Sequence, residues 1–264
     1  MLKHLIFGAL SLFLAVVPAR ADLHYTLHTE ARQVTPPEPV NPMLAMAGDI
    51  IVRTMLPDGP ADSIYWISDR GTRVELTKAN AVMPAGSVVL HLGDGTTVIM
   101  NPAEKTYWKI PLPQFMPEVF TALSQLNPQL SFVHTGEFAT IAGVRAEHIT
   151  SSTTMDVPSP PPGAPVPMGM PAAITMSADL WMADRYVDYA SLAQTAATMM
   201  GFGALIPQGF IMRHVMRNSM TPGVEIESVV TQIAEEPAPA DAFEIPADYK
   251  EVSAPFGRTA AQPR

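Results

Sequence analysis

The chain has 264 residues, a formal net charge of −9 and no cysteine, and 47% of its residues are hydrophobic. The missing cysteine excludes disulfides and an acylated N-terminal cysteine. The acidic balance, with Lys and Arg scattered singly, argues against nucleic acid and anionic membrane surfaces as partners, because both attract clustered basic side chains. Stability must therefore come from a hydrophobic core, which a chain of this length can bury.

The first residues have the order of a secretory leader. Lys3 and His4 precede an apolar run over residues 5–17, and Ala19-Arg20-Ala21 offers small residues at the −3 and −1 positions of a cleavage site. We expect a signal peptide over residues 1–21, cleaved after Ala21. The mature protein is then periplasmic or secreted, with no transmembrane anchor once the leader is removed.

Strand-like segments separated by turns fill the first half of the mature chain. The sequence Gly93-Asp94-Gly95 between two apolar runs is typical of a hairpin, in which both central residues take positive φ. The predicted strands cover residues 23–29, 49–55, 63–68, 72–78, 88–92, 96–100 and 104–110. Sequential strands joined by short turns predict an antiparallel meander.

A helix is predicted over residues 115–126, where Glu118 complements the dipole of the first turn and Asn127-Pro128 ends the helix. Its apolar stripe includes Phe120 and Leu123 and has to pack on the meander.

A second helix is predicted over residues 188–206, and it overlaps a stretch from Tyr189 to Met212 that carries no charge. Leu192, Met199 and Met200 share one of its faces. Polar residues, glycines and Pro207 make it a poor membrane span, so we interpret it as a buried or groove-covering helix.

The second half continues with strands at residues 131–138, 144–151, 174–182, 209–218 and 224–234. Met176, Leu180 and Met182 alternate with polar residues and share one face of the third of these. Residues 209–218 also fit helical spacing, so their state stays open. A Pro-rich loop is expected at 157–171, and a disordered tail at 253–264.

Three short segments near the C-terminus resemble a known pattern: GFIMRHVMRN, VEIESVVTQI and AFEIPADYKEV. They look like the signature of a group of exported bacterial proteins of unknown function, which is similar to the lipoprotein-carrier superfamily of the LolA and LolB type. The resemblance covers most of residues 45–252. Ala247-Asp248-Tyr249 departs from the Gly-Tyr that usually follows Phe-Glu-Ile-Pro in this group.

The resemblance implies an α+β fold: an open, strongly curved antiparallel sheet, or half barrel, with helices covering its concave face. We expect one such domain over residues 22–252. Between sheet and helices the resemblance implies an apolar cavity, and we expect the following residues to line it: Met176, Leu180, Met182, Leu192, Met199, Met200, Phe120 and Leu123.

No catalytic apparatus is evident in the sequence. It has no G-x-S-x-G elbow, and Glu225 and Glu227, which share a strand face, are interpreted as solvated. His24 and His28 stand four apart on a strand, roughly 13 Å from each other and too far to share a metal. We therefore expect neither an enzyme nor a cofactor or metal site.

Three functions stay open. The first is noncatalytic binding of a lipid or an acylated protein in the apolar cavity. The second is a structural or interaction protein of the cell envelope with a closed core. The third is a Cu(I)-binding protein that uses its methionines as soft ligands, with His214 beside them: Met168, Met170, Met176, Met212, Met216 and Met220.

Overall fold

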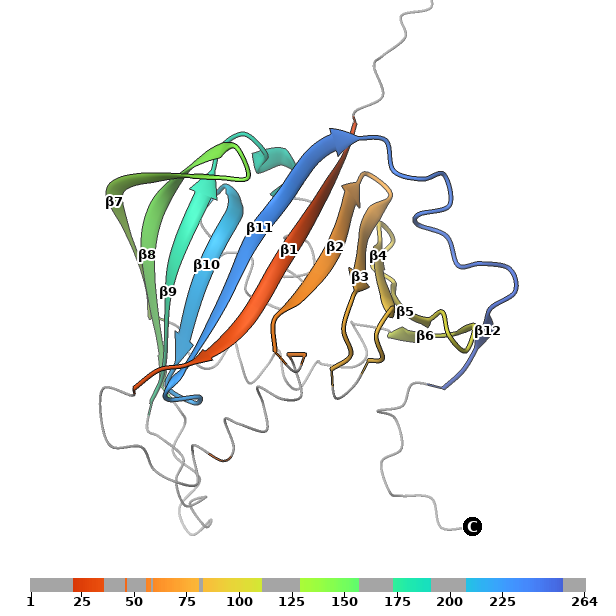
Figure 1. Cartoon of the computed structure of the whole chain (residues 1–264), viewed down its shortest axis with the longest axis horizontal. Helices are drawn as coiled ribbons and strands as arrows, with labels where there is room; N and C mark the ends of the chain where they lie inside the picture. Colours follow the sequence, from red (N-terminus) through yellow and green to blue (C-terminus); the bar gives the residue numbers. More distant parts are fainter. Residues whose placement is uncertain are drawn as a thin grey trace, which may run out of the picture.

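The computed structural model describes residues 21–35, 46, 56–57, 59–80, 83–110, 129–156, 173–190 and 208–253. Within them, twelve strands form a single sheet (Figure 1). The strands are β1 (Asp22–Gln33), β2 (Ala61–Ser68), β3 (Gly71–Leu76), β4 (Val88–Leu92), β5 (Thr97–Asn101), β6 (Thr106–Ile110), β7 (Gln129–Ile141), β8 (Val144–Asp156), β9 (Ala173–Ala183), β10 (Phe210–Asn218), β11 (Val224–Glu236) and β12 (Lys250–Glu251).

The first strand is central in the sheet, whose order is β12-β6-β5-β4-β3-β2-β1-β11-β10-β9-β8-β7. The N-terminal half forms the meander β1 to β6, and the C-terminal half forms the meander β7 to β11. Pairing of β1 with β11 joins the two halves, with Leu23 opposite Glu235 and Gln33 opposite Val224. The join therefore links residues about two hundred positions apart in sequence.

The sheet is open and curved. β7 and β12 form its two edges, yet β7 also contacts β11, although β8, β9 and β10 lie between them in the sheet order. A register shift between Ile211 and Arg213 adds one residue to β10, and pairing of β10 with β11 stops at Arg213. Such a bulge bends the strand and redirects its side chains. Phe210 consequently reaches Tyr25 of β1, edge to face, with ring centroids 5.3 Å apart.

Most sequence-based strands are confirmed, with ends shifted by a few residues. Residues 210–218 form a strand, which resolves the ambiguity of that segment. The strand expected at 49–55 lies outside the described residues. The antiparallel pattern has one exception, because β12 pairs with β6 in parallel.

The open antiparallel sheet is thus confirmed, whereas helices covering one face are not shown. The helix expected at 115–126 lies outside the described residues, as do the Pro-rich loop, the leader up to residue 20 and the tail from residue 254 onward. Of the helix expected at 188–206, only a single turn at 187–190 is described. Among the described residues, no helix has the length and hydropathy to cross a membrane.

The turn at residues 93–95 differs in its backbone angles from the predicted one. At residues 93–95, φ is positive only at Gly95, so the turn does not have the two positive-φ residues we expected. Asp94 instead accepts a hydrogen bond from the Thr96 backbone N–H at 2.8 Å. The hairpin with two consecutive positive φ angles is the one at Ala142 and Gly143.

The C-terminal segment after β11 packs against the strands β3 to β6 and ends in β12 beside β6 (Figure 1). Arg70 and Arg73 donate to the carbonyl oxygens of Ala240 and Ala242, at 2.9 and 3.0 Å. The Arg70 guanidinium also lies 4.6 Å from the centre of the Phe243 ring. Farther along, two side chains cover a buried cluster of Val88, Leu90, Val98 and Met100: Ile245 and Tyr249. We call residues 237–252 the C-terminal strap.

Replacing Phe243 by Ala tests whether the C-terminal strap stabilises the fold. The ring is 7% exposed, so its removal leaves a cavity and uncovers Arg70. We expect a loss of about 3 kcal/mol in the free energy of unfolding, measured by urea denaturation. The control is Glu244→Ala at the next, exposed position, which should change stability by less than about 0.5 kcal/mol. Equal effects of the two substitutions would contradict a stabilising role for the ring.

Candidate functional site

Charge is segregated between the two faces of the N-terminal half of the sheet. Successive residues of a strand point to opposite faces, and the register shows which residues of neighbouring strands share a face. Every Asp, Glu, Lys and Arg within β1 to β6 lies on one of them, the charged face: Asp22, Glu30, Arg32, Asp62, Arg73, Glu75 and Lys109. The other face of β1 to β6, which we call the uncharged face, therefore carries no formal charge.

A row of apolar and aromatic side chains crosses the uncharged face. Each member stands directly opposite the next on the neighbouring strand, from β11 to β6: Ile233, Tyr25, Tyr65, Val74, Val89, Ile99 and Trp108. Tyr25 and Tyr65 stack with ring centroids 4.5 Å apart. Because the row spans six strand spacings, it is roughly 29 Å long.

Titratable groups on this face are desolvated. Burial raises the pKa of Tyr25 well above its ordinary value, with a further contribution from Tyr65, whose own pKa is also raised by burial. Burial lowers the pKa of His91, which shares a hydrogen bond with Thr97 Oγ1 at 2.9 Å. Each shift favours the neutral form, so the uncharged face is a low-dielectric surface.

The uncharged face continues onto β11, β10 and β9, where it carries one charged residue, the exposed Glu235 opposite Leu23. Val230 pairs with Leu27 of β1, and two residues along β11 Ser228 pairs with His214, which stands opposite Leu180. Burial lowers the pKa of His214 as well. The same low-dielectric surface therefore extends as far as β9.

Some of the residues predicted to line the cavity lie on this surface, and the others lie outside the described residues. Leu180 and Met182 are buried together against Ile149, with Phe132 beside them. Met176 lies on the same face of β9, half-buried and opposite Thr153 of β8. The other predicted lining residues lie outside the described residues: Phe120, Leu123, Leu192, Met199 and Met200.

Sequence reasoning did not identify the uncharged face of β1 to β6, above all the row from Tyr25 to Trp108. A signal was present, because the charged residues of each of these strands fall at positions of one parity, for example Glu30 with Arg32 and Arg73 with Glu75. Deciding that these parities share one face needed the register between strands.

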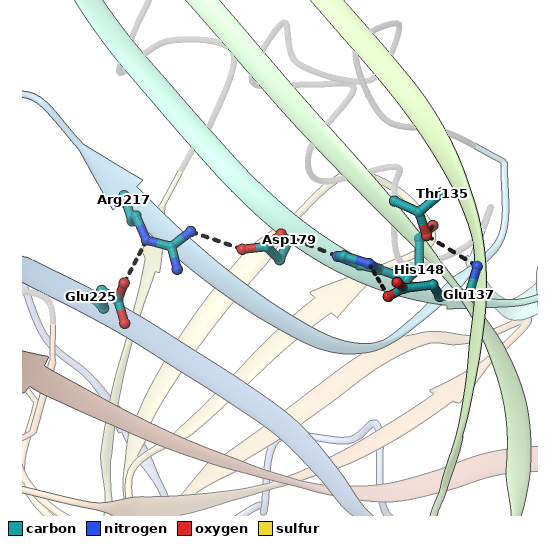
Figure 2. A network of polar contacts seen from close by, with 6 residues as sticks. All are labelled: Thr135, Glu137, His148, Asp179, Arg217 and Glu225. Atoms are coloured by element: carbon teal, nitrogen blue, oxygen red, sulfur yellow. Dashed lines mark hydrogen bonds and ion pairs between the residues drawn. The ribbon is translucent and has the colours of Figure 1, made fainter.

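The charged face continues onto the C-terminal half of the sheet, because Arg32 stands opposite Glu225 of β11. There it carries a network of polar contacts that crosses five neighbouring strands (Figure 2). Arg217 contacts Glu225 at 2.5 Å and Asp179 at 2.8 Å. Asp179 in turn accepts a hydrogen bond from His148 at 3.1 Å, and the other ring nitrogen of His148 lies 3.5 Å from Glu137. The network therefore links β11, β10, β9, β8 and β7 by side chains as well as by backbone.

A second line of contacts runs beside the first. His148 stacks on Trp181, with ring centroids 4.6 Å apart, and the Arg213 guanidinium lies 4.4 Å from the centre of the Trp181 ring. Glu227 accepts from Arg213 and contacts Arg32 of β1, each at 2.7 Å. The carboxylates Glu225 and Glu227 are thus ion-paired to arginines, which differs from the solvated state expected for them.

The histidines of the charged face have separate partners. His24 contacts Glu236 at 2.8 Å, and His28 contacts Asp62 at 2.7 Å. Across the described residues, no group of three or more His, Cys, Asp or Glu side chains could hold a metal ion.

The methionines of β10 do not gather into one site. Because residues 210–218 form a strand, Met212 and Met216 stand roughly 13 Å apart along it. Met212 is fully buried beside Phe210, whereas Met216 is exposed. Thioether ligation of one Cu(I) needs sulfur atoms that converge, and this pair does not provide them.

A model of one protein family matches residues 46–249, described as Domain of unknown function (DUF4412). This confirms the resemblance to a family of unknown function. Among solved structures, the chain is similar to a LolA superfamily protein from Nitrosomonas europaea, at 8% sequence identity and a TM-score of 0.33. That match covers 85% of this chain and 90% of the other. No curated protein matches the sequence.

Asp179→Asn tests the network on the charged face. Burial alone raises the pKa of Asp179, but hydrogen bonds from Arg217 and His148 outweigh burial and hold it below its ordinary value. A lowered carboxyl pKa adds stability that is complete above the unfolded-state value near 4 and is lost as pH falls through the folded-state value. We expect the variant to lose about 1 kcal/mol at pH 7, and the difference from the native protein to shrink as the pH falls below about 4.

Urea denaturation at a series of pH values measures this difference. Asp184→Asn, at an exposed position after β9, is the matched control and should follow the native protein at every pH. A difference between Asp179→Asn and the native protein that persists unchanged at pH 2.5 would show that the ion pair is not its cause.

Proposed function

The chain belongs to the DUF4412 family of domains of unknown function, and from this premise we propose that it is a noncatalytic binder of the hydrocarbon chain of a lipid or lipid-modified protein. The ligand lies along the uncharged face of the sheet.

The observation that carries the proposal is the unbroken row from Tyr25 to Trp108 on a face without formal charge. A sheet with one wetted face normally alternates polar and apolar residues and buries the apolar side against other elements. Ile99 and Trp108 are buried, yet neither belongs to the clusters that the described residues form with one another. A flexible hydrocarbon chain suits such a row because it needs no directional partner.

The energetics favour reversible binding. Removing about a dozen methylene groups from water stabilises the complex by roughly 0.8 kcal/mol each, or on the order of 10 kcal/mol in total. Association opposes this by about 4–15 kcal/mol. At the lower end of that cost the balance is about 6 kcal/mol in favour of binding, a reversible affinity that suits a carrier or sensor, which has to release its ligand.

The sequence supports an extracytoplasmic site of action, because a secretory leader over residues 1–21 exports the mature protein. We place it in the periplasm or the medium. Its partner is then a lipid or an acylated protein of the envelope.

The absence of catalysis is part of the proposal. On the charged face the carboxylates and His148 are engaged with arginines and with each other, in contacts that hold strands together. On the uncharged face, burial keeps His91 and His214 neutral, and Leu180 and Ser228 stand opposite His214. These surroundings suit histidines that line an apolar surface rather than a general base with an oriented partner.

Val74→Lys tests the site, with Ile64→Lys as its matched control. Both positions are half-buried and apolar on neighbouring strands, but Val74 lies on the uncharged face, and Ile64 lies on the charged face opposite Glu75. A buried charge without a partner disfavours an apolar ligand. We expect Val74→Lys to weaken binding of the neutral dye N-phenylnaphthylamine at least about tenfold, and Ile64→Lys to weaken it less than about twofold.

Fluorescence titration measures the affinities, and thermal melting establishes that both variants are folded. Native mass spectrometry of protein purified from its own cells should additionally reveal a retained acyl species, which requires no substitution. Dye binding that is lost equally in both variants, or a native protein that neither binds the dye nor retains an acyl species, would reject the proposed function.

A further inference from the structure

Two buried polar atoms have no hydrogen-bond partner in the described part of the chain: Trp108 Nε1 and Ser87 Oγ. Trp108 is 6% exposed and Ser87 is 0% exposed. Buried polar side chains in folded proteins nearly always have a partner, so each exception calls for an explanation.

Both atoms belong to the same region of the uncharged face. Trp108 stands opposite Ile99 on β5, which stands opposite Val89 on β4. Ser87 precedes β4 and continues its ladder, because its carbonyl oxygen accepts a hydrogen bond from the Leu76 N–H at 2.9 Å. By alternation its side chain shares the face of Val89, two residues further on.

We propose that Trp108 and Ser87 hold the neutral polar end of an acyl ligand, an ester or amide group, while its hydrocarbon tail follows the row toward Tyr25. This inference rests on the proposed function and adds the chemistry of the head group and the direction of the tail. The indole N–H of Trp108 donates to the carbonyl oxygen, and Ser87, two strands away and two residues from Val89, offers its hydroxyl to a further polar atom of the ligand.

The head group is neutral because, among the described residues, this face of β1 to β6 offers no cation. The basic residues of β1 to β6 lie on the charged face: Arg32, Arg73 and Lys109. A carboxylate or phosphate beside Trp108 would lose its hydration without gaining an ion pair, which is far more unfavourable than burying a hydrogen-bonded ester. The desolvation that keeps His91 neutral, two residues along β4 from Val89, has the same effect on an anion.

Three matched probes test the inference by fluorescence titration of the purified protein at pH 8. They are pyrenyldecane, which has no polar group, methyl pyrenyldecanoate, which is an ester, and pyrenyldecanoate, which is an anion. We expect the ester to bind about tenfold more tightly than the alkane, as one satisfied hydrogen bond allows, and at least about tenfold more tightly than the anion.

Trp108→Phe keeps an aromatic ring and removes the N–H. It should weaken the ester about fivefold to tenfold and leave the alkane within about twofold of its native affinity. The matched control is Trp66→Phe, since Trp66 lies on the opposite face, stacked on His24 with ring centroids 4.2 Å apart. This control should change neither affinity.

The outcomes separate the two proposals. Equal affinities for ester and alkane in the native protein, tighter binding of the anion than of the ester, or equal losses for both neutral probes in Trp108→Phe overturn the assignment of the head group but leave apolar binding in place. Binding of none of the probes overturns the proposed function together with this inference.

A second measurement on the native protein does not depend on the variant being folded. The assigned indole N–H resonance of Trp108 should move downfield when the ester is added and should not do so when the alkane is added. An unchanged Trp108 resonance in the ester complex would overturn the inference.

Discussion

This structure depends on one constraint. Side chains alternate between the two faces along a strand, and within each strand of β1 to β6 all charged residues fall at positions of the same parity. In β1 to β6 this constraint directs every Asp, Glu, Lys and Arg to a single face. A slip of one residue in any pairing would turn charged side chains toward the apolar row, so the register is strongly specified. The same alternation makes an extended surface that is apolar, without formal charge and desolvated.

Polar contacts on the charged face link strands of the C-terminal half and join that half to β1. The line of contacts from Arg217 through Asp179 to His148 ties β10 to β8, and Arg32 with Glu227 ties β1 to β11 at the join between the halves. These pairs are partly exposed, so each contributes modestly, and the pair of Arg32 with Glu227 links segments that are distant in sequence. The C-terminal strap acts similarly at the far edge, where β4 and β5 are apolar on both faces and need cover on each.

Local patterns in the sequence predicted most of the strands because alternation and turn residues are local signals. They could not predict that Leu23 pairs with Glu235 or that Lys250 adds a parallel strand beside Thr106, since these contacts join distant segments. For the site, Leu180 and Met182, which alternation placed on one face, are buried together, and their role in lining a cavity stays a prediction. The aromatic residues Tyr25, Tyr65 and Trp108 were missed because their common face follows from five successive strand pairings rather than from any one segment.

Paramagnetic broadening by a bound lipid tests the central claim most directly, namely that the uncharged face is the binding surface. The ligand is the methyl ester of a stearic acid that carries a nitroxide on its chain, and the readout is the methyl spectrum of the protein. We predict faster paramagnetic relaxation of the methyl protons of Val74, Val89 and Ile99 than of those of Leu90 and Val98 on the opposite face, because the effect falls with the sixth power of distance. Broadening confined to Leu90 and Val98, or equal on both faces, would contradict the account.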